Sequence, residues 1–137
     1  MAGDDPTAIR SIAISAADVV DAFVYSRENP GNAVLRVTPP FHGRMRARLH
    51  VYHRDDSRLT GAVHVEPADL LPADVVAAYP SFEAFADRAD AVDPAEIREA
   101  RGEAIETWRD RAADELVASV VLEADGERVR VDVKRLE

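Results

Sequence analysis

The chain has 137 residues, no cysteine, and a formal net charge of −9, with 26 acidic residues against 17 Lys and Arg. This length suits a single domain with a sizeable core, while the missing thiols exclude disulfides, thiolate metal sites and a cysteine nucleophile. No run of about 18 apolar residues is present, so we expect no membrane-spanning segment.

The kind of charge is as informative as its sign. Asp outnumbers Glu, and Arg almost replaces Lys, since Lys134 is the only lysine. Excess carboxylates keep a protein soluble through repulsion, and concentrated salt screens the cost of that repulsion to the fold. This composition predicts a salt-adapted, haloarchaeal, cytoplasmic protein. Because most proteins of such an organism are acidic, the overall negative charge says little about binding partners. A segment that is locally basic is more informative.

The first third of the chain predicts two strands around a helix. Residues 1–7 are expected to form an acidic tail without the basic and apolar parts of a secretion signal. Alternation predicts a short strand over 10–14. Ser15 then precedes an acid by three positions, which is a helix-start pattern, and apolar residues recur at helical spacing over 16–27. A further strand is predicted over 33–37.

The middle of the chain predicts a β-hairpin rich in arginine. Apolar and polar residues alternate over 43–53, as in a strand with one buried face, and residues 61–65 return as a second strand. The polar face of the first strand carries Arg44, Arg46, Arg48, His50 and Tyr52.

The remaining elements are helices followed by a hairpin. A helical turn is expected near residues 75–79, and Ser81 is expected to cap another short helix. Asp93 and Pro94 predict the start of a long helix that reaches about residue 117. Asp125-Gly126 then predicts a turn between strands at 119–124 and 127–134. We therefore expect one α+β domain over 8–137, with an antiparallel sheet of about five strands and helices packed on one face.

The central hairpin departs from the acidic background. Between Ala33 and His64 there are six arginines and only two acidic residues. Arginines at alternate positions of one strand line one face about 7 Å apart, which is similar to the spacing of phosphates along a nucleic-acid strand. Guanidinium groups bind phosphate in a bidentate manner, and Tyr52 offers a stacking surface. The pattern predicts a non-enzymatic module that binds nucleic acid or another polyanion.

Two other interpretations of these arginines stay open. If His53 lies opposite Gly61 in the hairpin, then Arg48 lies opposite Glu66 and the two form an ordinary cross-strand pair. Alternatively, the arginines pair with an acidic surface of another molecule, which would make the chain a homodimeric or protein–protein interaction domain.

The histidines suggest a third hypothesis. All four lie between His42 and His64, and the same register places His50 opposite His64. With a carboxylate such as Glu66 or Asp55, this pair could hold Zn²⁺ in a small metal-dependent enzyme. No local metal-binding or nucleophile motif and no phosphate-binding loop accompanies them. We therefore expect a binding module without a cofactor rather than an enzyme.

One segment carries a resemblance to a known family. The residues from Val34 to Val51, including the run Pro39-Pro40-Phe41-His42-Gly43, resemble the central part of small uncharacterised haloarchaeal proteins that form a domain-of-unknown-function family. The start, residues 5–10, fits the same family. The resemblance implies salt adaptation and the cytoplasmic compartment, and it implies no activity, cofactor or site residue.

Overall fold

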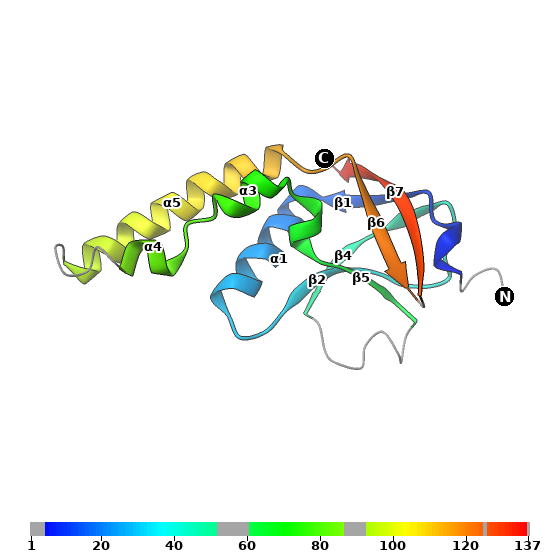
Figure 1. Cartoon of the computed structure of the whole chain (residues 1–137), viewed down its shortest axis with the longest axis horizontal. Helices are drawn as coiled ribbons and strands as arrows, with labels where there is room; N and C mark the ends of the chain where they lie inside the picture. Colours follow the sequence, from blue (N-terminus) through cyan, green and yellow to red (C-terminus); the bar gives the residue numbers. More distant parts are fainter. Residues whose placement is uncertain (1–4, 52–60, 87–92, 125, 137) are drawn as a thin grey trace.

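Two small β-sheets share one core with helix α1 in the computed structural model, which describes residues 5–51, 61–86, 93–124 and 126–136 (Figure 1). One sheet has four strands in the order β3-β1-β7-β6, and the other has three in the order β4-β2-β5. The strands are β1 (Ser11–Ser15), β2 (Ala33–Val37), β3 (Arg44–Arg46), β4 (Arg48–Val51), β5 (Val63–Val65), β6 (Ser119–Ala124) and β7 (Glu127–Leu136).

The predicted helix-start residues are confirmed. The Ser15 hydroxyl accepts a hydrogen bond from the amide of Asp18 at 3.4 Å, and the Asp93 carboxylate accepts one from Ala95 at 2.9 Å. No described helix has the length and apolar character needed to cross a membrane. The helices are η2 (Pro6–Ala8), α1 (Ala16–Glu28), η3 (Pro67–Leu70), α3 (Ala73–Ala77), α4 (Phe82–Ala86) and α5 (Pro94–Asp114).

The α+β class is confirmed, but the prediction of one antiparallel sheet of about five strands is wrong. β1 pairs in parallel with both β3 and β7, and only the β6–β7 hairpin is antiparallel in that sheet. Gly126 lies in the turn of this hairpin with φ of +77°, a conformation that favours glycine. Alternation reveals a strand but not its partner, so pairing between distant segments was not predictable.

The single strand predicted over 43–53 is also wrong, because it is divided between the two sheets at Ala47. Ala47 is buried, and its N–H donates to the Ala13 carbonyl at 3.0 Å. Residues 44–46 therefore extend the four-stranded sheet, while residues 48–51 belong to the three-stranded one.

The predicted pairing of this segment with residues 61–65 is wrong as well. β4 and β5 both pair antiparallel with β2, on its two sides. Consequently Arg48 lies opposite Arg36 rather than Glu66, and His50 lies opposite Val34 rather than His64. His64 also lies opposite Arg36, so β2 inserts between the two strands that the sequence predicted to be neighbours.

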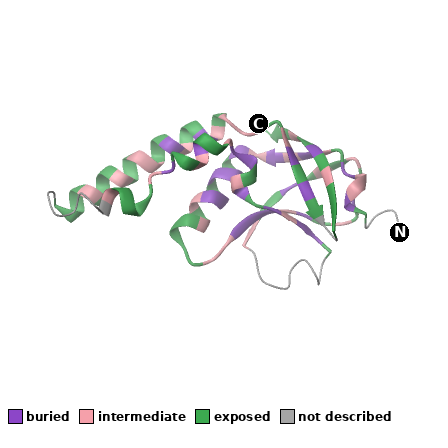
Figure 2. Ribbon diagram, viewed as in Figure 1, coloured by how far each residue is buried: buried purple, intermediate pink, exposed green. Residues whose placement is uncertain are grey.

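The core lies between α1 and the inner faces of the two sheets (Figure 2). Ile12 and Ile14 of β1, Leu35 of β2 and Val19 of α1 are completely buried within it. Trp108 joins this core from the last turns of α5, where its ring lies 4.9 Å from those of Phe23 and Tyr79. Its indole N–H donates to the Val75 carbonyl at 2.8 Å, which fixes α5 to α3.

The first half of α5 extends beyond this core together with α4 (Figures 1 and 2). We call α4 and residues 94–105 of α5 the arm. The only buried residues of α5 are Trp108 and Ala112, both in its C-terminal half. The arm is therefore attached to the core at one end and open to solvent along most of its length.

Candidate functional site

The arginines singled out in the sequence are exposed, but two different sheets present them. Arg44 and Arg46 lie on β3 at the edge of the four-stranded sheet, and Arg48 begins β4 of the other sheet. Arg44 and Arg46 occupy alternate positions of one strand, so they share a face about 7 Å apart, as expected. Arg46 and Arg48 nevertheless line the same pocket, because the chain passes from one sheet to the other at Ala47 between them.

A pocket of about 280 Å³ lies where the two sheets meet, and we call it the junction pocket. Arg36, Arg46 and Arg48 reach it from three strands, and His50 joins them. Thr38 and Leu49 complete its lining. The sequence predicted Arg46, Arg48 and His50 as site residues but did not include Arg36, which a central, half-buried position on β2 brings into the site.

Among the described residues that line the junction pocket there is no carboxylate. Arg36 and Arg48 are directly opposed across β2 and β4, an arrangement that is unfavourable for like charges. The ion pairs of the described residues involve other arginines, such as Arg101 and Arg109. Arg36 Nε is buried and has no hydrogen-bond partner among the described residues. The pocket therefore concentrates positive charge and hydrogen-bond donors that an anion would satisfy.

Arg36 also contacts His50. Its Nη1 lies 3.3 Å from His50 Nδ1 and 3.4 Å from Nε2. Because a guanidinium only donates, a nitrogen of the His50 ring must accept in this contact. The rings of His50 and His64 stack with centroids 6.1 Å apart, so the two predicted histidines are close although they do not pair in register. Both lie on the face of the three-stranded sheet that carries Arg36.

The outer face of the four-stranded sheet extends the positive charge away from the junction pocket. The register aligns Arg46 with Ala13 and Lys134, and Arg44 with Ser11 and Asp132. Five basic residues and two acidic ones project from this face. They are Arg44, Arg46, Arg128, Arg130, Lys134, Glu123 and Asp132.

Part of this outer face is already paired. Arg128 lies 3.2 Å from Glu123, with both side chains mostly exposed, and Arg130 donates to the Ser119 hydroxyl. This extension was not predicted, although charged and apolar residues alternate over 128–134 and three of the four charged ones are basic.

Two other predicted features remain untested. Tyr52 and Asp55 lie outside the described residues, so neither the stacking role of Tyr52 nor a metal ligand from Asp55 can be placed. Within the described ranges, no group of three or more His, Asp or Glu side chains has a metal-binding arrangement. His50 and His64 thus lack a third described ligand.

A second polar cluster joins α1 to the arm. Arg101 binds Glu28 in a bidentate manner, at 3.0 and 2.7 Å, and the Tyr79 hydroxyl donates to Glu28 at 2.5 Å. The bond from Arg101 holds the pKa of Glu28 below its ordinary value, whereas burial and the adjacent carboxylate raise the pKa of Tyr79 to about 12. The Glu28 carboxylate, both terminal nitrogens of Arg101 and the Tyr79 hydroxyl are hydrogen-bonded to one another, and only Arg101 Nε has no partner among the described residues. We therefore assign this cluster a structural role.

The fold and the site together define a small α+β protein with an arginine-lined pocket between two sheets. A family model described as a domain of unknown function, DUF8009, matches residues 1–137, and the chain belongs to this family. The predicted membership of a family of unknown function is thereby confirmed, while the haloarchaeal origin stays a prediction. Comparisons with curated proteins and with solved structures give no match.

Proposed function

We propose that this protein binds nucleic acid, or another phosphate-bearing polyanion, through a basic strand surface made of Arg36, Arg44, Arg46 and Arg48. The observation that supports this proposal is the convergence of three of these arginines on a pocket whose described lining residues include no carboxylate. A structural network would be expected to include acidic partners, which this acid-rich chain has in abundance. None of the described ion pairs uses these four arginines.

The junction pocket suits a single phosphate group of such a ligand. Arg46 and Arg48 present exposed guanidinium groups, which bind phosphate oxygens in a bidentate manner. Arg36 would contribute its buried Nε as a further donor. Arg44 lies one alternate position from Arg46 and would contact the next phosphate. Contacts of this kind recognise the backbone and carry no base sequence, so we infer binding that is largely independent of sequence.

The half-buried position of Arg36 matters for a protein with this composition. We propose that the chain works in a salt-rich cytoplasm, where exposed phosphate contacts lose much of their affinity. Charges that are partly buried are screened less by salt than exposed ones. A contact with the half-buried Arg36 would therefore lose less affinity in salt than contacts with the exposed Arg44, Arg46 and Arg48.

The experiment is a fluorescence anisotropy titration with short single-stranded and duplex oligonucleotides. We expect the wild type to bind both and an Arg44/Arg46/Arg48→Ala variant to lose at least tenfold in affinity. The matched control is Arg98/Arg109/Arg111→Ala, which removes the same number of charges from α5. Circular dichroism and the fluorescence of Trp108 establish that each variant is folded.

Several results would reject the proposal. Failure of the wild type to bind either oligonucleotide is the first, and equal losses in the two triple variants would be the second. A carboxylate-rich protein surface could engage the same arginines, so poly-glutamate is included as a competitor. If poly-glutamate binds and oligonucleotides do not, the site serves an acidic protein partner instead.

A further inference from the structure

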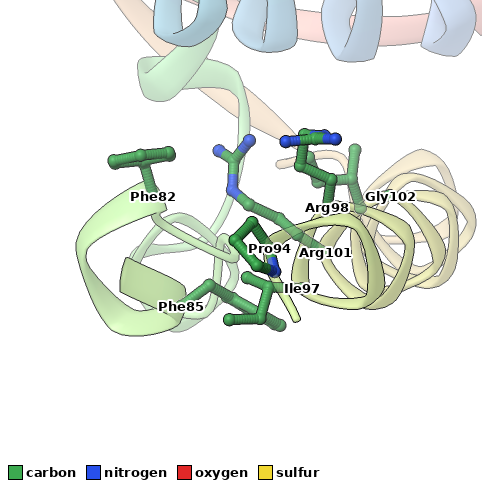
Figure 3. A pocket seen from close by; sticks show the side chains of 8 residues that line it. Phe82, Phe85, Pro94, Ile97, Arg98, Arg101 and Gly102 are labelled. Carbon is green, nitrogen blue, oxygen red and sulfur yellow. The ribbon is translucent and has the colours of Figure 1, made fainter. Parts of the chain in front are cut away.

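An apolar groove runs along the arm, far along the chain from the basic strand surface. Phe82 and Phe85 of α4 lie on one side and Ile97 of α5 on the other (Figure 3). Ile105 of α5 also lines the groove. The groove encloses about 470 Å³. Phe82 is 69% exposed, the highest value among the exposed large apolar side chains of the described residues. Leaving such a surface in water is costly, which indicates that something covers it.

The charges of α5 are arranged so that the groove face avoids acids. Residues 96, 99, 103, 106 and 110 are acidic and exposed, and their spacing places them on one side of the helix. The groove side carries Arg98 and Arg101 instead, and Arg101 is neutralised by Glu28. In a chain with a net charge of −9, two copies that meet through this side keep the acidic sides of their α5 helices apart.

We propose that two copies of this chain associate through their arms, with the groove of each copy covered by the arm of the other. Each arm consists of two helices with one shared apolar face, which is half of a four-helix bundle. A two-fold interface brings the same face of both copies together. Arg98 lines the groove, and the exposed Glu83 follows Phe82 on α4, so antiparallel arms could bring Arg98 of each copy towards Glu83 of the other.

The arm has little packing of its own that would stabilise its helices. Its residues bury little against the core of their own chain, and short helices without tertiary packing are unstable in water. Association would supply the missing packing. The contact is small, because about 12 residues of α5 span only about 18 Å, so we expect a reversible dimer whose population depends on concentration.

Sedimentation velocity over a range of protein concentrations tests the proposal. We expect the wild type to form dimers that Phe82→Ser or Ile97→Ser converts to monomers, while Glu99→Gln and Glu103→Gln leave them intact. Trp108 fluorescence reports that the core is folded in each variant. Concentrated salt should strengthen the dimer, since it screens net repulsion and favours apolar burial. A dimer held by Arg44, Arg46 and Arg48 on acidic residues would instead weaken.

Cross-linking locates the interface independently. The chain has no cysteine, and a Cβ at Gly102 would meet nothing within 4 Å, so Gly102→Cys introduces one accessible thiol in the groove. A short thiol-specific cross-linker should join two copies of this variant. Glu103→Cys, one residue further round the helix, should not be joined. A wild type that stays monomeric at every concentration and salt level would overturn the proposal, as would dimers unaffected by Phe82→Ser and Ile97→Ser.

Discussion

Arg36 lies directly opposite Arg48 in the pairing of β2 with β4, and both side chains project to the same face of the sheet. Cross-strand neighbours of like charge are destabilising, and the part of the chain that the structure describes contributes no carboxylate to the pocket that they line with Arg46. The fold therefore holds two cations together without a described counter-ion. An anionic ligand bound between the two guanidinium groups would remove this repulsion.

Arg48→Thr should stabilise the protein in a low-salt buffer without phosphate. Removing one of two opposed charges, and placing a β-branched residue on a strand, should raise the free energy of unfolding by about 0.5 kcal/mol. Added inorganic phosphate should raise the Tm of the wild type more than that of the variant, because a ligand stabilises the state that binds it. Differential scanning fluorimetry across a phosphate series measures both effects.

Arg128→Thr is the matched control for this prediction. Arg128 is also an exposed strand arginine, but it lies beside Glu123 rather than another cation. We expect no gain in stability and an unchanged response to phosphate. An Arg48→Thr protein that responds to phosphate as strongly as the wild type would argue against an anion site at the junction pocket.

The Glu28 cluster should make stability depend on pH at both ends of the range. The pKa of Glu28 is lowered in the folded state, so its stabilising contribution is present above the ordinary carboxyl pKa and is lost as pH falls through the folded value. The pKa of Tyr79 is raised to about 12. Its contribution is therefore present below the ordinary phenol pKa, about 10, and is lost as pH rises towards 12.

Glu28→Gln should weaken both dependences and lower the free energy of unfolding at neutral pH by about 2 kcal/mol, because Arg101 and Tyr79 lose a charged acceptor. Urea unfolding at several pH values provides the measurement. Asp21→Asn, which breaks the more exposed ion pair with Arg109, should cost no more than about 0.5 kcal/mol. Equal losses in the two variants would show that the Glu28 cluster has no special role in attaching the arm.

Trp108→Phe should destabilise the junction of α5 with α3 by about 2 kcal/mol. The smaller ring keeps part of the aromatic contact with Phe23 and Tyr79, but the Val75 carbonyl loses its indole donor in a buried position. A buried polar group left without a partner costs about 1–3 kcal/mol. Urea unfolding followed by circular dichroism measures the loss, since the variant has no tryptophan. A variant as stable as the wild type would contradict the structural role of this bond.

Substitution of two glycines by alanine should change the stability of the protein in opposite directions. Gly102 lies within α5 with open space around it, so Gly102→Ala should stabilise the helix by about 0.5–1 kcal/mol. Gly126 has φ of +77° in the β6–β7 turn, where alanine is strained, and Gly126→Ala should cost about 1 kcal/mol. Thermal unfolding of the two variants checks the contrast, and changes of the same sign would contradict it.

Local features of the fold were predictable from the sequence. The caps at Ser15 and Asp93, the strand at 33–37 and the hairpin around Gly126 depend on neighbouring residues, and the structure confirms them. The pairing of strands depends instead on residues that are distant in the sequence. Alternation over 43–53 continues through Ala47 without a break, so nothing local indicated that this residue leaves one sheet for another.

Most residues of the candidate site were predictable from the sequence, but the arrangement of the strands that carry them was not. Arg46, Arg48 and His50 do come together, but around β2 instead of within one hairpin. Arg36 was absent from the prediction because its strand was expected to be an ordinary core element. Its position between β4 and β5 is a property of the sheet order, which periodicity does not encode.

The most direct test of the central claim is the salt dependence of oligonucleotide binding by the wild type and the two triple variants. Each arginine that neutralises a phosphate contributes about one unit to the slope of log K against log salt. We expect the Arg44/Arg46/Arg48→Ala variant to have a slope shallower by about 2 to 3 units, and the Arg98/Arg109/Arg111→Ala control to keep the wild-type slope. Identical slopes in the two triple variants would contradict phosphate binding at the basic strand surface.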